Sequence, residues 1–154
     1  MPRPGMTLIV KEVTKLVSGF IALYAAYIVL YGHLTPGGGF AGGVILACGF
    51  ILIVLAFGRD FAAQVISDAG AKSWDTFGAM LFLLVALVGY RVGAFFSNFL
   101  PLRSNFRLVS AGAIPVSNIA IGIKVAACLL GVFLALSVYR AARAGGGEEE
   151  ELHD

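Results

Sequence analysis

Lys124 and His33 are the two residues of this 154-residue sequence whose type and position could support proton or cation transfer. Lys124 lies about seven residues, or ~10 Å, inside a long apolar run. A charged side chain at that depth of a bilayer is unfavourable unless it faces protein or water, so Lys124 marks a candidate ion pathway. The alternative is that its ammonium group snorkels to the nearer membrane surface.

The helical face that carries Lys124 is small and weakly polar. Cys128, Gly131 and Ala135 follow it at spacings of three or four residues, which places them on one side of a helix. We therefore expect this face to meet protein rather than lipid.

His33 stands at the end of another apolar run, beside a glycine-rich stretch. Histidine is the side-chain type that exchanges protons near neutral pH without special surroundings, so His33 could serve at the mouth of an ion path. The alternative is an interfacial histidine that hydrogen-bonds to a loop carbonyl.

No acidic residue is predicted to lie deep in an apolar run, where it could pair with Lys124 or bind a cation. The acidic residues fall in loops, helix ends or the C-terminal tail: Glu12, Asp60, Asp68, Asp75, Glu148, Glu149, Glu150, Glu151 and Asp154. Asp75 is interpreted as the N-cap of a helix that begins at Thr76. We therefore expect a charged Lys124 to take its counter-ion from another chain.

The stretch after His33 predicts a tight turn and then closely packed helices. Its proline and glycines prevent ordinary helix formation at the start. These residues are Pro36, Gly37, Gly38, Gly39, Gly42 and Gly43. The four-residue spacing of positions 38 and 42, and of 39 and 43, lets membrane helices approach closely. The formal GxGxxG match in this stretch is not a nucleotide site, because no strand precedes it.

The composition predicts an all-α membrane protein. Hydrophobic residues make up 59% and charged residues 13% of the sequence, whereas a soluble chain carries roughly 25% charged residues. Four apolar runs are long enough to cross a hydrocarbon core of ~30 Å, at about residues 13–32, 40–58, 76–96 and 117–139. We expect short loops, a transmembrane domain over residues 1–140 and a disordered acidic tail over 141–154.

Basic residues predict that both termini lie in the cytoplasm. Those on the side of the termini and the middle loop are Arg3, Lys11, Lys15, Arg59, Lys72, Arg140 and Arg143. The opposite side has only Arg91, Arg103 and Arg107.

The sequence contains no pattern typical of an enzyme or a metal site. Cys48 and Cys128 both fall in apolar runs and form neither a CxxC pair nor a disulfide framework. There is no nucleophile–base pair, metal cluster or cofactor motif, so no catalytic residue and no cofactor is assigned. No basic patch alternates with exposed aromatic residues, so nucleic acid is not an expected partner.

Two segments resemble the B subunit of Mrp-type multisubunit Na+/H+ antiporters, the MnhB or MrpB family. Residues 13–15 with 31–43 are similar to the family's G-H-x-x-P-G-G-G-F-x-G-G motif. Residues 110–115 with 118–125 are similar to its small-residue-I-P-x-x-N-x-x-I-G-x-K run. Pro115, Gly122 and Lys124 stand at positions of the second motif, and the likeness extends over about residues 7–140.

The resemblance implies an integral protein of a prokaryotic cell (inner) membrane, assembled with large antiporter-like subunits and other small ones. Such an assembly exchanges external H+ for cytoplasmic Na+, and Lys124 and His33 are its implied ion-translocation residues in this chain. The same module occurs in membrane-bound hydrogenases and complexes akin to respiratory complex I, so a redox-driven ion pump is the alternative host. A purely structural scaffold, whose glycine faces join neighbouring subunits, is the second alternative.

Overall fold

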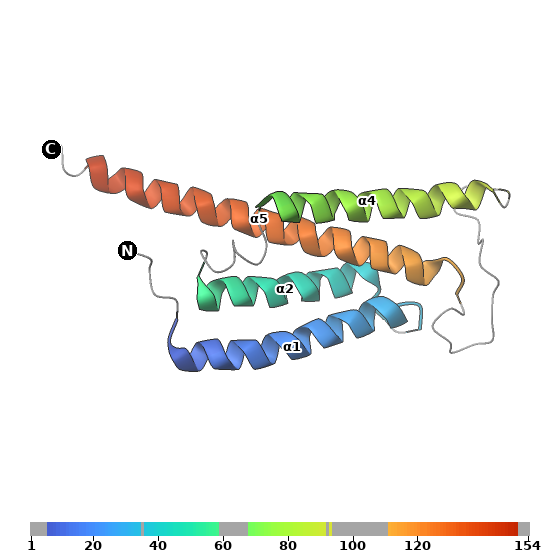
Figure 1. Ribbon diagram of the computed structural model, residues 1–154, viewed down its shortest axis with the longest axis horizontal. Coiled ribbons are helices and arrows are strands. Elements are labelled where there is room, and N and C mark those ends of the chain that lie inside the picture. Colours follow the sequence, from blue (N-terminus) through green and yellow to red (C-terminus); the bar gives the residue numbers. More distant parts are fainter. Residues whose placement is uncertain (1–5, 35, 59–67, 92, 94–110, 151–154) are drawn as a thin grey trace.

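The computed structural model describes residues 6–34, 36–58, 68–91, 93 and 111–150, with side chains up to residue 139. In these ranges the chain forms four long helices (Figure 1). Within these ranges every regular element is an α-helix: α1 (Leu8–Tyr31), α2 (Gly39–Phe57), α4 (Asp68–Tyr90) and α5 (Ile114–Glu150). Each contains an apolar stretch that is long enough to cross a membrane. The predicted all-α architecture with four membrane spans is therefore confirmed.

The helix boundaries differ most from the predicted ones at the start of α4 and at the end of α5, which was predicted at residue 139. Helix α2 begins and ends within one residue of its predicted bounds, whereas α4 begins at Asp68 rather than Thr76. The predicted end of the third span at residue 96 lies outside the described residues. Helix α5 runs to Glu150 without described side chains beyond residue 139, so the disordered acidic tail stays a prediction.

The helices lie in the order α1, α2, α5, α4 across the bundle (Figure 1). Helix α5 packs against α2 on one side and α4 on the other, and α1 packs mainly against α2. Helix α1 begins, and α5 ends, at the same end of the bundle (Figure 1). The turn between α1 and α2 lies at the opposite end, where α5 begins.

Close contact between α2 and its neighbours depends on glycines. An added Cβ on Gly39 would clash with the carbonyl oxygen of Asn118 on α5, and one on Gly42 would clash with Val29 on α1. The turn before α2 needs glycine for another reason, because Gly38 has a φ of 106° that other residues rarely adopt. Pro115 lies in the first turn of α5, where a helix tolerates proline.

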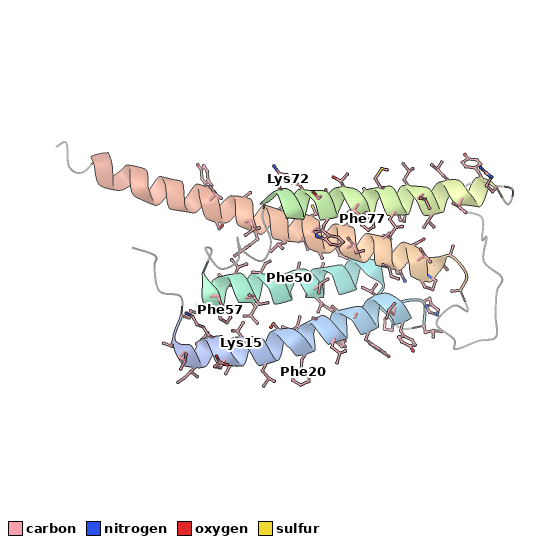
Figure 2. The ribbon with its side chains drawn as sticks, in the orientation of Figure 1. Lys15, Phe20, Phe50, Phe57, Lys72 and Phe77 are labelled. Atoms are coloured by element: carbon pink, nitrogen blue, oxygen red, sulfur yellow. The ribbon has the colours of Figure 1, made fainter. Side chains whose placement is uncertain are left out.

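Small residues fill the interior, and large apolar side chains point outward. Most of the buried apolar residues are alanines, such as Ala25, Ala47 and Ala120. Phe20 and Leu23 on α1 are 64% and 70% exposed, and Figure 2 shows Phe20 directed away from the other helices. This inverted pattern is typical of helices that pack through small residues while their larger side chains contact lipid or other subunits.

Two lysines join the start of α1 to the end of α2. The ammonium groups of Lys11 and Lys15 lie 5.8 Å and 5.9 Å from the centroid of the Phe57 ring. Lys15 also forms an ion pair with Glu12 at 2.7 Å. The cations are attracted to the face of the ring, which holds them at one end of the bundle.

Gly43→Ala is expected to destabilise the bundle by about 1–3 kcal/mol, as over-packed cores generally are. The added Cβ would lie 2.8 Å from the carbonyl oxygen of Gly122 and 2.9 Å from the Cβ of Val125. The thermal midpoint of the purified protein in detergent should therefore fall. Gly19→Ala is the matched control, because nothing lies within 4 Å of its added Cβ. Equal thermal midpoints for the two variants would contradict this account of the packing.

Candidate functional site

Lys124 lies well inside the membrane span of α5. That span covers Ile114–Tyr139, so Lys124 is ~15 Å along the helix from one end and ~22 Å from the other. The sequence likewise indicated a position well inside the apolar run. A lysine at this depth needs a partner or water around its ammonium group.

Asp75 lies inside α4 and is not its N-cap, which corrects the interpretation from the sequence. The helix begins at Asp68, so Asp75 is ~10 Å along it, within the apolar span Ala69–Tyr90. Two hydroxyl side chains near Asp75 bond to carbonyls of the same helix. Ser73 Oγ donates to the carbonyl of Ala69, and Thr76 Oγ1 donates to that of Lys72.

Lys124 finds its counter-ion within the same chain. Its Nζ donates a hydrogen bond to Oδ1 of Asp75 at 2.8 Å, which also makes an ion pair between α5 and α4. The expectation that the counter-ion comes from another chain is therefore wrong. It failed because the apolar run begins only after Asp75, so hydropathy alone placed this carboxylate at a helix end.

Gly78 brings the two helices close enough for this pair to form. It follows Asp75 by three residues, on the same face of α4. A Cβ added to Gly78 would lie 2.8 Å from the backbone N of Lys124 and 2.9 Å from its Cα. The backbones of α4 and α5 therefore meet at Lys124. The sequence analysis did not predict this contact. The three-residue spacing of Asp75 and Gly78 could have indicated it, because it places both residues on one face of a helix.

The Asp75–Lys124 pair borders a groove between α4 and α5. The groove has a volume of about 560 Å³ and is lined on the α5 side by Cys128, Gly131 and Ala135 among others. These are the small residues expected to meet protein; Cys128 and Ala135 are exposed and Gly131 is half-buried. Asp75 and Lys72 line the α4 side of the groove.

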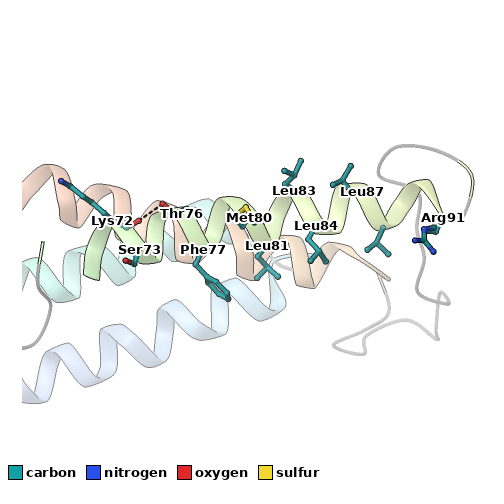
Figure 3. A pocket seen from close by; sticks show the side chains of 11 residues that line it. Lys72, Ser73, Thr76, Phe77, Met80, Leu81, Leu83, Leu84, Leu87 and Arg91 are labelled. Atoms are coloured by element: carbon teal, nitrogen blue, oxygen red, sulfur yellow. Dashed lines mark hydrogen bonds between the residues drawn. The ribbon is translucent and has the colours of Figure 1, made fainter. Parts of the chain in front are cut away.

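A larger hollow of about 1150 Å³ follows another face of α4 (Figure 3). Lys72 and Arg91 lie at its two ends, with Met80 and Leu84 among the apolar residues between them (Figure 3). The two cations are ~28 Å apart along the helix, close to the ~30 Å thickness of a hydrocarbon core. They can therefore reach the two membrane surfaces. The described lining contains no acidic residue, so this hollow is a lipid-facing or protein-facing surface rather than a cation site.

His33 lies apart from the ion pair, in the turn that follows α1. The amide of Leu34 donates to the carbonyl of Tyr31 at 2.8 Å, which closes this turn around His33. The Nδ1 atom of His33 is shielded from solvent. The turn lies at the end of the bundle where α5 begins (Figure 1), whereas Lys124 lies inside the helix. His33 and Lys124 are thus placed at different depths.

The described helices bring together a carboxylate and an ammonium group rather than a set of metal ligands. Across these residues, no group of three His, Cys, Asp or Glu side chains gathers. A carboxylate paired with an ammonium group can exchange that partner for another cation or accept a proton. The site is therefore an ion pair that joins α4 to α5.

A family model described as a domain related to the MnhB subunit of Na+/H+ antiporter matches residues 9–131. An uncharacterized protein of Methanocaldococcus jannaschii is 36% identical over 108 residues, which cover 66% of this chain and 41% of that protein. The B subunit of an Na+/H+ antiporter of Bacillus subtilis is 48% identical over 50 residues, which cover 32% of this chain and 35% of that protein.

Among solved structures, this chain is similar to a chain of the membrane-bound sulfane sulfur reductase, an archaeal respiratory membrane complex. The TM-score is 0.72 at 31% identity, and the match covers 86% of this chain and 59% of that chain. The present chain thus spans less than two thirds of the length of each of these relatives.

Proposed function

The chain belongs to the family of membrane proteins related to the MnhB subunit of Na+/H+ antiporters, and from this membership we propose that it is a small subunit of a multisubunit Na+/H+ antiporter. In this proposal it contributes to ion translocation and to assembly of the complex. The observation that carries the proposal is the Asp75–Lys124 ion pair inside two apolar spans.

The ion pair allows the proposed subunit to respond to cations. When no other cation is present, the positive charge of Lys124 balances the negative charge of the Asp75 carboxylate. An Na+ ion or a proton that reaches Asp75 competes with the Lys124 ammonium for the same oxygen atoms. Binding of Na+ at Asp75 is balanced in charge when the displaced Lys124 ammonium gives up its proton, and this coupled loss of H+ is the proposed exchange step.

His33 and the glycine turn have a proposed role at the entrance to the ion path. The turn lies at the end of the bundle where α5 begins (Figure 1), and histidine is suited to proton exchange near neutral pH. We propose that His33 exchanges protons there, while Pro36 and Gly37 shape the backbone of the turn. Lys124 and Asp75 then act deeper in the membrane.

The proposed orientation places both termini in the cytoplasm of a prokaryotic cell, on the inner side of its membrane. The excess of lysine and arginine on that side supports it. The start of α1 and the end of α5 lie at the same end of the bundle (Figure 1), as this orientation requires.

Lys124→Ala and Asp75→Asn are expected to abolish Na+-dependent proton flux while the complex remains assembled. Each variant removes one partner of the exchanging pair. Flux is measured in membrane vesicles that carry the complex, as the collapse of a pH gradient when Na+ is added. Lys15→Ala is the control, because its ion pair with Glu12 lies exposed near the start of α1. Normal flux in Lys124→Ala would refute the transport role, and loss of assembly in that variant would favour the scaffold alternative.

A second candidate host is a respiratory, redox-driven ion pump. The structural match to a chain of a respiratory membrane complex covers 86% of this chain and supports this host. Both candidates use the same ion pair in this chain and differ in the partner proteins.

Purification of the tagged chain in mild detergent should separate the two hosts. If the antiporter proposal is correct, mass spectrometry will identify large antiporter-like subunits and other small membrane subunits. Co-purified iron–sulfur or nickel–iron subunits would instead assign the chain to a redox-driven pump. A chain that purifies alone would contradict both.

A further inference from the structure

The Asp75–Lys124 pair is left partly uncovered within the membrane span. The side chains of Lys124 and Asp75 are 45% and 35% exposed, although both lie in apolar spans. Charged groups at membrane depth face protein or a water-filled cavity, because lipid chains offer no hydrogen-bond partners. This side of α4 and α5 is therefore not a lipid-facing surface, and a further group must cover it.

The groove beside the pair has the shape of a helix-packing surface. Ala127, Gly131 and Ala135 line it at intervals of four residues along α5, and Ala71 lines it from α4. Nothing lies within 4 Å of a Cβ added to Gly131, so the groove is open at its middle. Small residues at this spacing allow the backbone of another membrane helix to approach closely. The groove has a volume of about 560 Å³, which is enough for one row of side chains from such a helix but not for the whole helix.

The charges around the groove indicate what the helix must carry. Asp75 and Lys72 line the groove, and Lys124 already balances the charge of Asp75. The described charged groups at this face thus leave a net positive charge beside an apolar groove. A single carboxylate on the docked helix would balance it.

We propose that the groove between α4 and α5 docks one apolar transmembrane helix of a partner protein, which brings a carboxylate to Lys72. This inference rests on the proposed function in one respect, since it requires the chain to be part of a multisubunit complex. The docked helix covers the Asp75–Lys124 pair, and its carboxylate balances the charge of Lys72. The ion pair then lies at an interface between subunits rather than at the edge of the complex.

The steric test replaces Gly131 by leucine in the full complex. Gly131→Leu places a large side chain in the groove, at a position where nothing lies within 4 Å of the added Cβ. It should lower the amount of partner protein recovered per tagged chain about tenfold. Gly19→Leu is the matched control, because Gly19 is also a helical glycine with nothing within 4 Å of an added Cβ. It lies on α1, away from the groove, and should leave recovery unchanged.

A photo-crosslinking side chain at Val132, which lines the groove and is 52% exposed, identifies what lies there in the assembled complex. The expected product joins Val132 to an apolar segment of a co-purifying protein that contains Asp or Glu. Crosslinks to lipid alone, or normal recovery of the partner with Gly131→Leu, would overturn the docking site. If the docking site fails either test but the wild-type complex assembles and transports ions, the proposed function still holds. A wild-type chain that purifies alone would instead contradict the proposed function.

Discussion

A charge within the hydrocarbon layer must be paired or hydrated, and the arrangement of α4 and α5 follows from this constraint. Lys124 and Asp75 lie on different helices, and each would be unfavourable alone in its apolar span. Gly78 removes the side chain that would hold the two backbones apart, so the carboxylate reaches the ammonium group at 2.8 Å. The pair thus fixes how α4 lies against α5, and the glycines of α2 hold α5 from the other side.

The same constraint connects the fold to the proposed function. The Asp75 carboxylate is neutralised by Lys124, and in the proposed function Na+ competes with that lysine for the carboxylate. Partial exposure of the pair means that its surroundings are completed by another protein or by water. A small protein with a small-residue interior and large outward side chains is suited to such an assembly, because its outer surface is already apolar.

The number and type of the helices could be predicted from the sequence, whereas the partner of Lys124 could not. Long apolar runs identify membrane spans directly, and Lys124 stood out because it interrupts one of them. Asp75 precedes its apolar run, so hydropathy placed it at a helix end. In the structure this helix begins at Asp68, so the polar residues before the apolar run are helical and Asp75 lies inside the helix. The approach at Gly78 depends on how two helices pack, which the pattern of either helix alone does not specify.

The central claim is that Asp75 and Lys124 pair with each other inside the membrane, and exchanging their charges tests it most directly. The measurement is the thermal stability of the purified complex with Asp75→Lys, with Lys124→Asp and with both changes together. Each single change places two like charges side by side and should lower stability sharply. The double change restores opposite charges, so we predict that it recovers most of the lost stability. A double variant whose loss equals the sum of the two single losses would contradict the pairing.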